Sequence, residues 1–270
     1  MPKRQRELVY PPVIRTAKLV FSGLGIRFDI TGTEHVPATG GAVVAINHTG
    51  YLDFTFAGLA VLPRKRLVRF MAKKEVFDHK VSGPLMRGMH HIAVDRASGA
   101  ESYQAAVKAL AGGEMVGVFP EATISQSFDL KEFKTGAARM AMEAGVPILP
   151  VVIWGSQRIF TKHRKKDLRR GAHVRIVVGE TFTPDPAGNA VDVTAELKTR
   201  MNALLAEARA TYKGEPYDGD DSWWIPSSMG GTAPTLEQAA ERDRADKERK
   251  ATKRAAKRAA KPAPRQSAGG

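Results

Sequence analysis

The sequence predicts a single α/β domain with a mixed central β-sheet flanked by helices, an N-terminal amphipathic helix and a disordered basic C-terminal tail. Two observations carry this prediction. From residue 40 onward, short β-branched runs alternate with helical patterns, which is typical of α/β sheets. Of the 270 residues, 43% are hydrophobic and 26% are charged, a composition that fits a globular protein and excludes a wholly disordered one.

The first expected element is a helix at residues 13–28. Its apolar side chains recur at helical spacing opposite Arg15, Lys18 and Ser22. Such a helix either packs its apolar face on the protein's own core or lies in a membrane interface. Strands are expected at 42–46, 67–71, 91–94, 115–119, 148–153 and 174–178, and further helices at 53–62, 100–111, 135–144 and 193–212.

A segment rich in Gly, Pro, Asp and Ser follows, and it contains Trp223 and Trp224. The two indoles either lie at the level of lipid head groups or pin this extension to the body. The chain then ends in a strongly basic tail.

Positive charge is concentrated in that tail. Lys and Arg number 42 against 28 Asp and Glu, giving a net charge of +14. Residues 242–270 hold 11 basic and 3 acidic side chains, a net charge of +8. Their Ala-Lys-Arg repeats have no apolar face to bury, so we expect a disordered arm. Such an arm either attracts anionic lipid or nucleic acid or only keeps the protein soluble.

Several classes of protein are excluded by what the sequence lacks. Cysteine is absent, so disulfides, thiolate metal sites and cysteine nucleophiles are ruled out. No stretch of about 20 apolar residues is present to span a bilayer, and no signal-peptide cleavage pattern follows the first apolar stretch. The chain has no G-x-S-x-G, P-loop or G-x-G-x-x-G motif. His90 and His91 are neighbours on an expected strand and cannot share an ion, so no metal is expected.

Polar residues follow two of the expected strands. The strand at 42–46 ends before Asn47 and His48, and Asp53 follows in the first turn of a helix. A carboxylate there either caps the helix or accepts a hydrogen bond from the imidazole, leaving its other nitrogen free as a base. The strand at 115–119 leads to Glu121 and Thr123, which could shape a pocket or cap a turn.

Lys131 and Lys134 precede the helix that opens near Gly136, a position that favours phosphate. The cluster Arg-Lys-Arg-Leu-Val-Arg at 64–69 is a further candidate contact with a membrane surface.

Four blocks in order resemble the PlsC-type glycerolipid acyltransferases, the 1-acyl-glycerol-3-phosphate acyltransferase family, over about residues 20–215. They are Asn-His-Thr-Gly-Tyr-Leu-Asp at 47–53, Ile-Ala-Val-Asp-Arg at 92–96, Phe-Pro-Glu-Ala-Thr-Ile-Ser at 119–125 and Val-Pro-Ile-Leu-Pro at 146–150. The resemblance implies that His48 deprotonates the acceptor hydroxyl and that Asp53 orients the imidazole of His48. It implies substrate binding by Asn47, Lys73, Lys74, Arg96, Glu121, Thr123 and Lys134.

Two residues depart from the family's third block. Ala122 stands where glycine is common, and Ile124 stands where the family has an arginine. Either Arg96, Lys73, Lys74 and Lys134 supply the missing charge, or the acceptor is not a simple phosphomonoester. These departures resemble an actinobacterial branch of the family.

The resemblance implies transfer of a fatty acyl group to 1-acyl-sn-glycerol 3-phosphate, giving phosphatidic acid. It implies acyl-CoA or acyl carrier protein as co-substrate, no bound cofactor, and a peripheral or monotopic place on an anionic surface at the cytoplasmic face of the membrane. One alternative is a different acceptor, either glycerol 3-phosphate or a glycolipid. The other is a non-catalytic basic protein that binds membrane or nucleic acid, although no specific nucleic acid is expected. The implied parts are a membrane-contact segment at 1–30, an acyltransferase domain at 31–215, the Trp-containing extension at 216–241 and the polybasic tail at 242–270.

Overall fold

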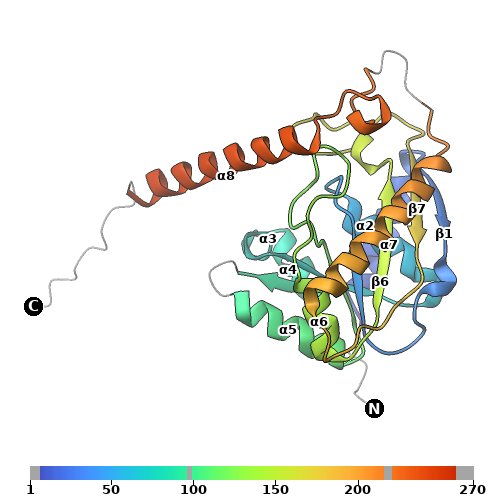
Figure 1. Ribbon diagram of the computed structural model, residues 1–270, viewed down its shortest axis with the longest axis vertical. Helices are drawn as coiled ribbons and strands as arrows, with labels where there is room; N and C mark the ends of the chain where they lie inside the picture. The colour runs from blue at the N-terminus through green and yellow to red at the C-terminus, as the bar shows by residue number, and fades with distance from the viewer. Residues whose placement is uncertain (1–6, 96–98, 216–220, 260–270) are drawn as a thin grey trace, which may run out of the picture. The chain divides into compact units, whose positions relative to one another are not determined.

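The computed structural model describes residues 7–95, 99–215 and 221–259 (Figure 1). The chain divides into two compact units. The first unit comprises residues 1–125 and 130–220, and the second comprises 126–129 and 221–270. This division falls close to the expected end of the acyltransferase domain at residue 215 and adds a short segment, 126–129, to the C-terminal part.

A seven-stranded sheet forms the centre of the first unit, in the order β1-β7-β6-β2-β5-β3-β4. All neighbouring pairs are parallel except β6 and β7, which are antiparallel, so the expected mixed sheet is confirmed. The strands are β1 (Arg27–Thr31), β2 (Ala42–Ile46), β3 (Val68–Lys73), β4 (Ile92–Val94), β5 (Met115–Val118), β6 (Ile148–Trp154) and β7 (His173–Val178).

Helices cover the sheet. Both α2 and α7 pack on β6 and β7, and α7 lies in front of these strands in Figure 1. The α-helices of the first unit are α1 (Tyr10–Gly23), α2 (Asp53–Val61), α3 (Lys74–Asp78), α4 (Ser82–Gly88), α5 (Gly99–Ala111), α6 (Gly136–Ala144) and α7 (Ala190–Ala210), with short 3-10 turns at Thr33–His35, Leu62–Arg64 and Ser156–Arg158. No helix among the described residues is both long and apolar enough to cross a bilayer.

The direction of the strands places three loops together. Strands β2, β5 and β6 are adjacent and parallel, so their carboxyl ends meet at one edge of the sheet. Every residue of these three strands is buried, because each strand is covered on both faces. The loops that carry Asn47, Glu121 and Gly155 therefore leave a rigid core at the same edge.

The N-terminal helix is shorter than expected. It ends at Gly23, and Gly25, with φ of 63°, turns the chain into β1, which the sequence had not predicted. On α1, Phe21 packs into the core, while Leu19 and Val20 stay 74% and 52% exposed.

The expected disorder of the tail is wrong for the described residues 242–259. They belong to α8 (Leu236–Ala259) of the second unit, which also holds the 3-10 turn Ser227–Met229. Thr235 and Gln238 form a capping box: the amide of Gln238 donates to the hydroxyl of Thr235, and the amide of Thr235 donates to the side-chain oxygen of Gln238. Ala, Glu, Lys and Arg are strong helix formers, so the helix does not need an apolar face to persist. Residues 260–270 lie outside the described part of the chain.

In the basic cluster at 64–69, which the sequence offers as a membrane contact, Arg64 and Lys65 are exposed, but Arg66 and Arg69 are buried. The guanidinium of Arg66 is buried and donates to the carbonyls of Pro37, Gly40 and Gly113. Arg69 is buried as well and pairs with Glu7 and Glu114. These two cations hold backbone and carboxylate partners inside the fold and do not face a lipid surface.

Candidate active site

The loop after β2 is held against β6 by Asn47. The side-chain amide of Asn47 donates to the carbonyl of Ile153 at 2.9 Å, and its oxygen accepts from the amide of Ile153 at 2.7 Å. Asn47 is fully buried, so it fixes the start of the loop and does not reach a substrate. Its predicted role in substrate binding has no support in these contacts.

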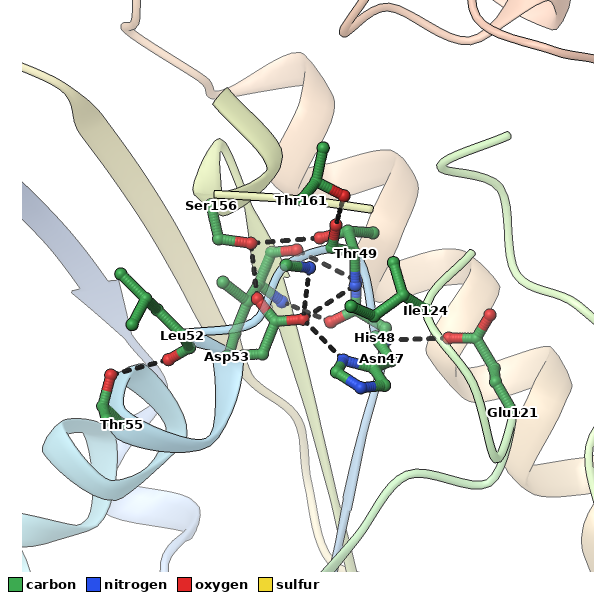
Figure 2. Close-up of polar contacts among 12 residues, drawn as sticks. Asn47, His48, Thr49, Leu52, Asp53, Thr55, Glu121, Ile124, Ser156 and Thr161 are labelled. Carbon is green, nitrogen blue, oxygen red and sulfur yellow. Dashed lines mark hydrogen bonds and ion pairs between the residues drawn. The ribbon is translucent and has the colours of Figure 1, made fainter. Parts of the chain in front are cut away.

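The expected bond between His48 and Asp53 is present. Nδ1 of His48 lies 3.1 Å from Oδ2 of Asp53, which begins α2 and is fully buried (Figure 2). The same oxygen accepts the backbone N–H groups of Thr49 and Gly50, both at 2.7 Å. An ionised carboxylate only accepts, so the tautomer of His48 that forms this hydrogen bond carries its proton on Nδ1 and keeps the lone pair of Nε2.

Glu121, in the loop after β5, supports the loop that carries His48. Its Oε1 accepts the backbone N–H of His48 at 2.8 Å, and its Oε2 accepts that of Lys131 at 3.1 Å. Burial raises the pKa of Glu121 to about 7, and the two hydrogen bonds and Lys131 oppose this shift. The carboxylate thus braces the backbone of His48, a role that the sequence had not predicted.

A cavity of about 580 Å³ opens beside the imidazole. The ring of His48 stacks on Phe119, with centroids 4.0 Å apart, and its side chain keeps 19% exposure. The walls are largely apolar, and the ammonium-bearing side chains on them are Lys73 and Lys134, both exposed. A cavity of this kind suits a molecule with an apolar chain and an anionic group.

The other predicted binding residues lie in different places. Nζ of Lys74 donates to Asp95 at 3.0 Å, and this hydrogen bond raises the pKa of Lys74. The hydroxyl of Thr123 accepts from Nζ of Lys131 at 2.5 Å. Neither Lys74 nor Thr123 lines the cavity. Arg96 lies outside the described residues.

The histidine pair was placed on a strand, but both residues precede β4, which begins at Ile92. His91 is a core residue: it is buried and accepts the backbone N–H of Phe70 at 3.1 Å.

Sequence reasoning missed Ser156, which touches the other oxygen of Asp53. Its hydroxyl donates to Oδ1 of Asp53 at 2.5 Å and lies 3.1 Å from the hydroxyl of Thr49 (Figure 2). The signal was available, because Gly155 and Ser156 follow the buried strand β6 in the same way that His48 follows β2.

Known proteins resemble this chain in sequence and in fold. Residues 27–154 match the family model described as Acyltransferase. The 1-acyl-sn-glycerol-3-phosphate acyltransferase of Bacillus subtilis is 32% identical over 149 residues, which are 54% of this chain and 69% of that protein. The enzyme of the same name from Borreliella burgdorferi is 29% identical, and the match covers 52% of this chain and 56% of that one.

A solved structure shares the fold. The 1-acyl-sn-glycerophosphate acyltransferase PlsC of Thermotoga maritima superposes with a TM-score of 0.62 at 22% sequence identity, covering 74% of this chain and 80% of that chain. That structure shows the fold, and the family model over residues 27–154 together with the relative in Bacillus subtilis shows the class of protein, an acyltransferase. Within that class, the chain belongs to the PlsC-type family of glycerolipid acyltransferases.

Proposed function

We propose that this protein transfers a fatty acyl group from a thioester, acyl-CoA or acyl carrier protein, to the free hydroxyl of 1-acyl-sn-glycerol 3-phosphate. The observation that carries the proposal is His48, which is hydrogen-bonded to a buried carboxylate through Nδ1 and lines an apolar cavity with its ring. The names of the relatives in Bacillus subtilis and Borreliella burgdorferi support this choice of acceptor.

The proposed reaction needs one base and no covalent intermediate on the protein. Nε2 of His48 takes the proton of the acceptor hydroxyl as its oxygen attacks the thioester carbonyl. The tetrahedral intermediate then expels the thiolate, which takes the proton back from the imidazolium. Asp53 stabilises that imidazolium and keeps the ring in the tautomer with Nε2 unprotonated.

The cavity favours an acceptor that carries an anion and an apolar chain. Lys73 and Lys134 line it, and they are the candidates for contact with the phosphate. The family's arginine is replaced by Ile124, whose side chain is buried. A competition of lysophosphatidate, glycerol 3-phosphate and a glycolipid for one donor, read by mass spectrometry of the products, decides among acceptors. Preferred acylation of glycerol 3-phosphate or the glycolipid would overturn the proposed one.

The test of the chemistry is His48→Ala, with His163→Ala as the matched control because His163 is an exposed loop residue. We expect His48→Ala to lose acyl transfer by at least 10³-fold while keeping its circular dichroism spectrum and thermal midpoint. Full activity in His48→Ala would defeat the proposal.

Removal of residues 242–270, net charge +8, tests the alternative of a non-catalytic basic protein. If all measurable function is lost with this segment while His48→Ala behaves as wild type, the protein acts by binding.

We further propose that α1 contacts an anionic membrane surface. Leu19 and Val20 are exposed on it beside the cations Arg15 and Lys18. In co-sedimentation with vesicles containing phosphatidylglycerol, Leu19→Asp is expected to bind at least fivefold more weakly than wild type. Leu168→Asp, which changes a leucine in a loop that is 57% exposed, is expected to bind as wild type. Equal binding by Leu19→Asp and wild type would contradict this placement.

A further inference from the structure

The two oxygens of Asp53 have different surroundings. Oδ2 accepts from His48 and from the amides of Thr49 and Gly50, all within the turn that leads into α2. Oδ1 accepts from Ser156, which lies 103 residues further along the chain. The orientation of the carboxylate is therefore set from two sides, one local in sequence and one from β6.

The direction of each hydrogen bond in this cluster can be assigned. An ionised carboxylate only accepts, so the hydroxyl proton of Ser156 points at Asp53. The oxygen of Ser156 is then left as an acceptor, and the hydroxyl of Thr49, 3.1 Å away, donates to it. The result is a chain of two hydroxyl groups, from Thr49 to Ser156 to Asp53, that ends on the partner of His48.

The surrounding backbone holds this chain in place. Gly155 has φ of 95°, which turns the chain sharply after β6, and a Cβ there would lie 2.3 Å from the carbonyl of His173. A Cβ on Gly50 would lie 3.0 Å from the hydroxyl oxygen of Ser156. The carbonyl of Thr49 accepts the hydroxyl of Thr161 at 2.6 Å. The close approach of Ser156 to Asp53 thus depends on Gly155 and Gly50, and Thr161 anchors the backbone of Thr49.

Burial strengthens the hydrogen bonds of these hydroxyl groups and excludes water that could replace them. Asp53 is 0% exposed, and Thr49 and Ser156 are each 1% exposed, so water does not take the place of a lost donor. A hydrogen bond to a buried anion is stronger than one between neutral groups.

We propose that Ser156 is a positioning residue for acyl transfer, acting through Asp53, with Thr49 in support. The proposal rests on the proposed role of His48 as the base. By holding Oδ1, Ser156 fixes the rotation of the carboxylate, so that Oδ2 faces Nδ1 of His48 and Nε2 is left for the acceptor hydroxyl. Neither hydroxyl group touches the substrate.

The experiment is a double-mutant cycle on acyl transfer. Ser156→Ala is expected to lower kcat by about 10- to 100-fold, the loss of one hydrogen bond to a charged group. Thr49→Val is expected to lower kcat by about 3- to 10-fold, the loss of a bond between neutral groups. KM for both substrates is expected to stay within about twofold, because the binding cavity is unchanged.

The cycle separates this role from a merely structural one. Because Thr49 acts through Ser156, the double variant is expected to have the kcat of Ser156→Ala alone. The low-field NMR resonance of the Nδ1 proton of His48 is expected to move in Ser156→Ala and to stay in place in Thr194→Ala. Thr194 provides the matched control, since it is also buried and its hydroxyl donates within α7.

The outcomes that overturn the inference are distinct from those that overturn the function. A wild-type kcat and an unmoved Nδ1 resonance in Ser156→Ala would refute the positioning role while His48→Ala remains inactive. Additive losses in the double variant would refute the coupling through Ser156. If Ser156→Ala does not fold, Thr49→Val still decides, because a wild-type kcat and resonance in that variant contradict the hydroxyl chain.

Discussion

Replacing Asp53 with Asn changes the charge of the buried partner of His48 and keeps its shape. The amide oxygen can take the place of Oδ2 and accept from His48, Thr49 and Gly50. The amide nitrogen then faces Ser156, whose hydroxyl can accept instead of donate. All four hydrogen bonds are therefore kept, and only their charge assistance is lost.

The magnitude follows from the geometry. Nδ1 of the imidazolium formed during transfer would lie 3.1 Å from Oδ2 of a fully buried carboxylate, while the side chain of His48 keeps 19% exposure. The centres of the two delocalised charges would then be about 4 Å apart. At an effective dielectric constant of about 20, a pair of unit charges at that separation is worth about 4 kcal/mol. We expect Asp53→Asn to lower kcat by about 10³-fold.

The assay measures kcat of acyl transfer from the steady-state release of the thiol. Urea denaturation of the same preparation measures the free energy of unfolding. Stability is expected to fall by only about 1–3 kcal/mol, because charged hydrogen bonds are replaced by neutral ones. Asp53→Ala is the unsuitable variant, since it leaves several buried donors without an acceptor. A folded Asp53→Asn protein with kcat within tenfold of wild type would refute the role of the carboxylate charge.

Three further predictions concern stability. Ala122 has φ of 61°, a conformation that favours glycine, so Ala122→Gly is expected to raise the free energy of unfolding by about 1 kcal/mol in urea titrations; no gain would contradict the strain. A Cβ on Gly117 would lie 2.6 Å from the ring of Phe70, so Gly117→Ala is expected to lower the free energy of unfolding by about 1–3 kcal/mol in the same titration. An equally stable variant would show that β5 or Phe70 shifts to accommodate the methyl group. Burial raises the pKa of Glu121 to about 7, so this carboxyl stabilises the fold as the pH drops from about 7 to 4.5. Burial lowers the pKa of His91 from 6.5 to about 4, so below pH 6.5 the unfolded state binds a proton that the folded state does not, and His91 contributes the opposite change, a loss of stability as the pH drops from about 6.5 to 4. That pH dependence, followed by thermal unfolding, is expected to shrink in His91→Gln, and identical curves would rule out this histidine as its source.

Much of the fold could be predicted because its signals are local. The β-branched runs predicted six of the strands nearly to the residue, and β2, β5 and β6, which are buried along their whole length, are apolar throughout. Strand β1 was missed because Phe28 also fits the helical spacing of the preceding segment, and only the turn at Gly25 separates the two. The prediction of a disordered tail is wrong for residues 242–259, because helix propensity suffices for α8 without an apolar face.

The basic cluster at 64–69 shows where local charge misleads. In sequence it is a run of cations and suggests an exposed surface. In the fold, Arg66 and Arg69 are buried because carbonyl oxygens and carboxylates from distant segments surround their guanidinium groups. The number of donors on a guanidinium makes such burial possible, but the acceptors are not neighbours in sequence.

By itself the sequence determined the pair His48 and Asp53, because one turn of chain separates them and the helix that follows fixes their spacing. Only the tertiary structure decided which groups hold that pair. Ser156 and Glu121 lie 103 and 73 residues away from the groups they contact, and they meet them because three parallel strands end at one edge of the sheet. A hydrogen bond requires an approach of about 3 Å, and over such separations along the chain the folded strands alone provide it.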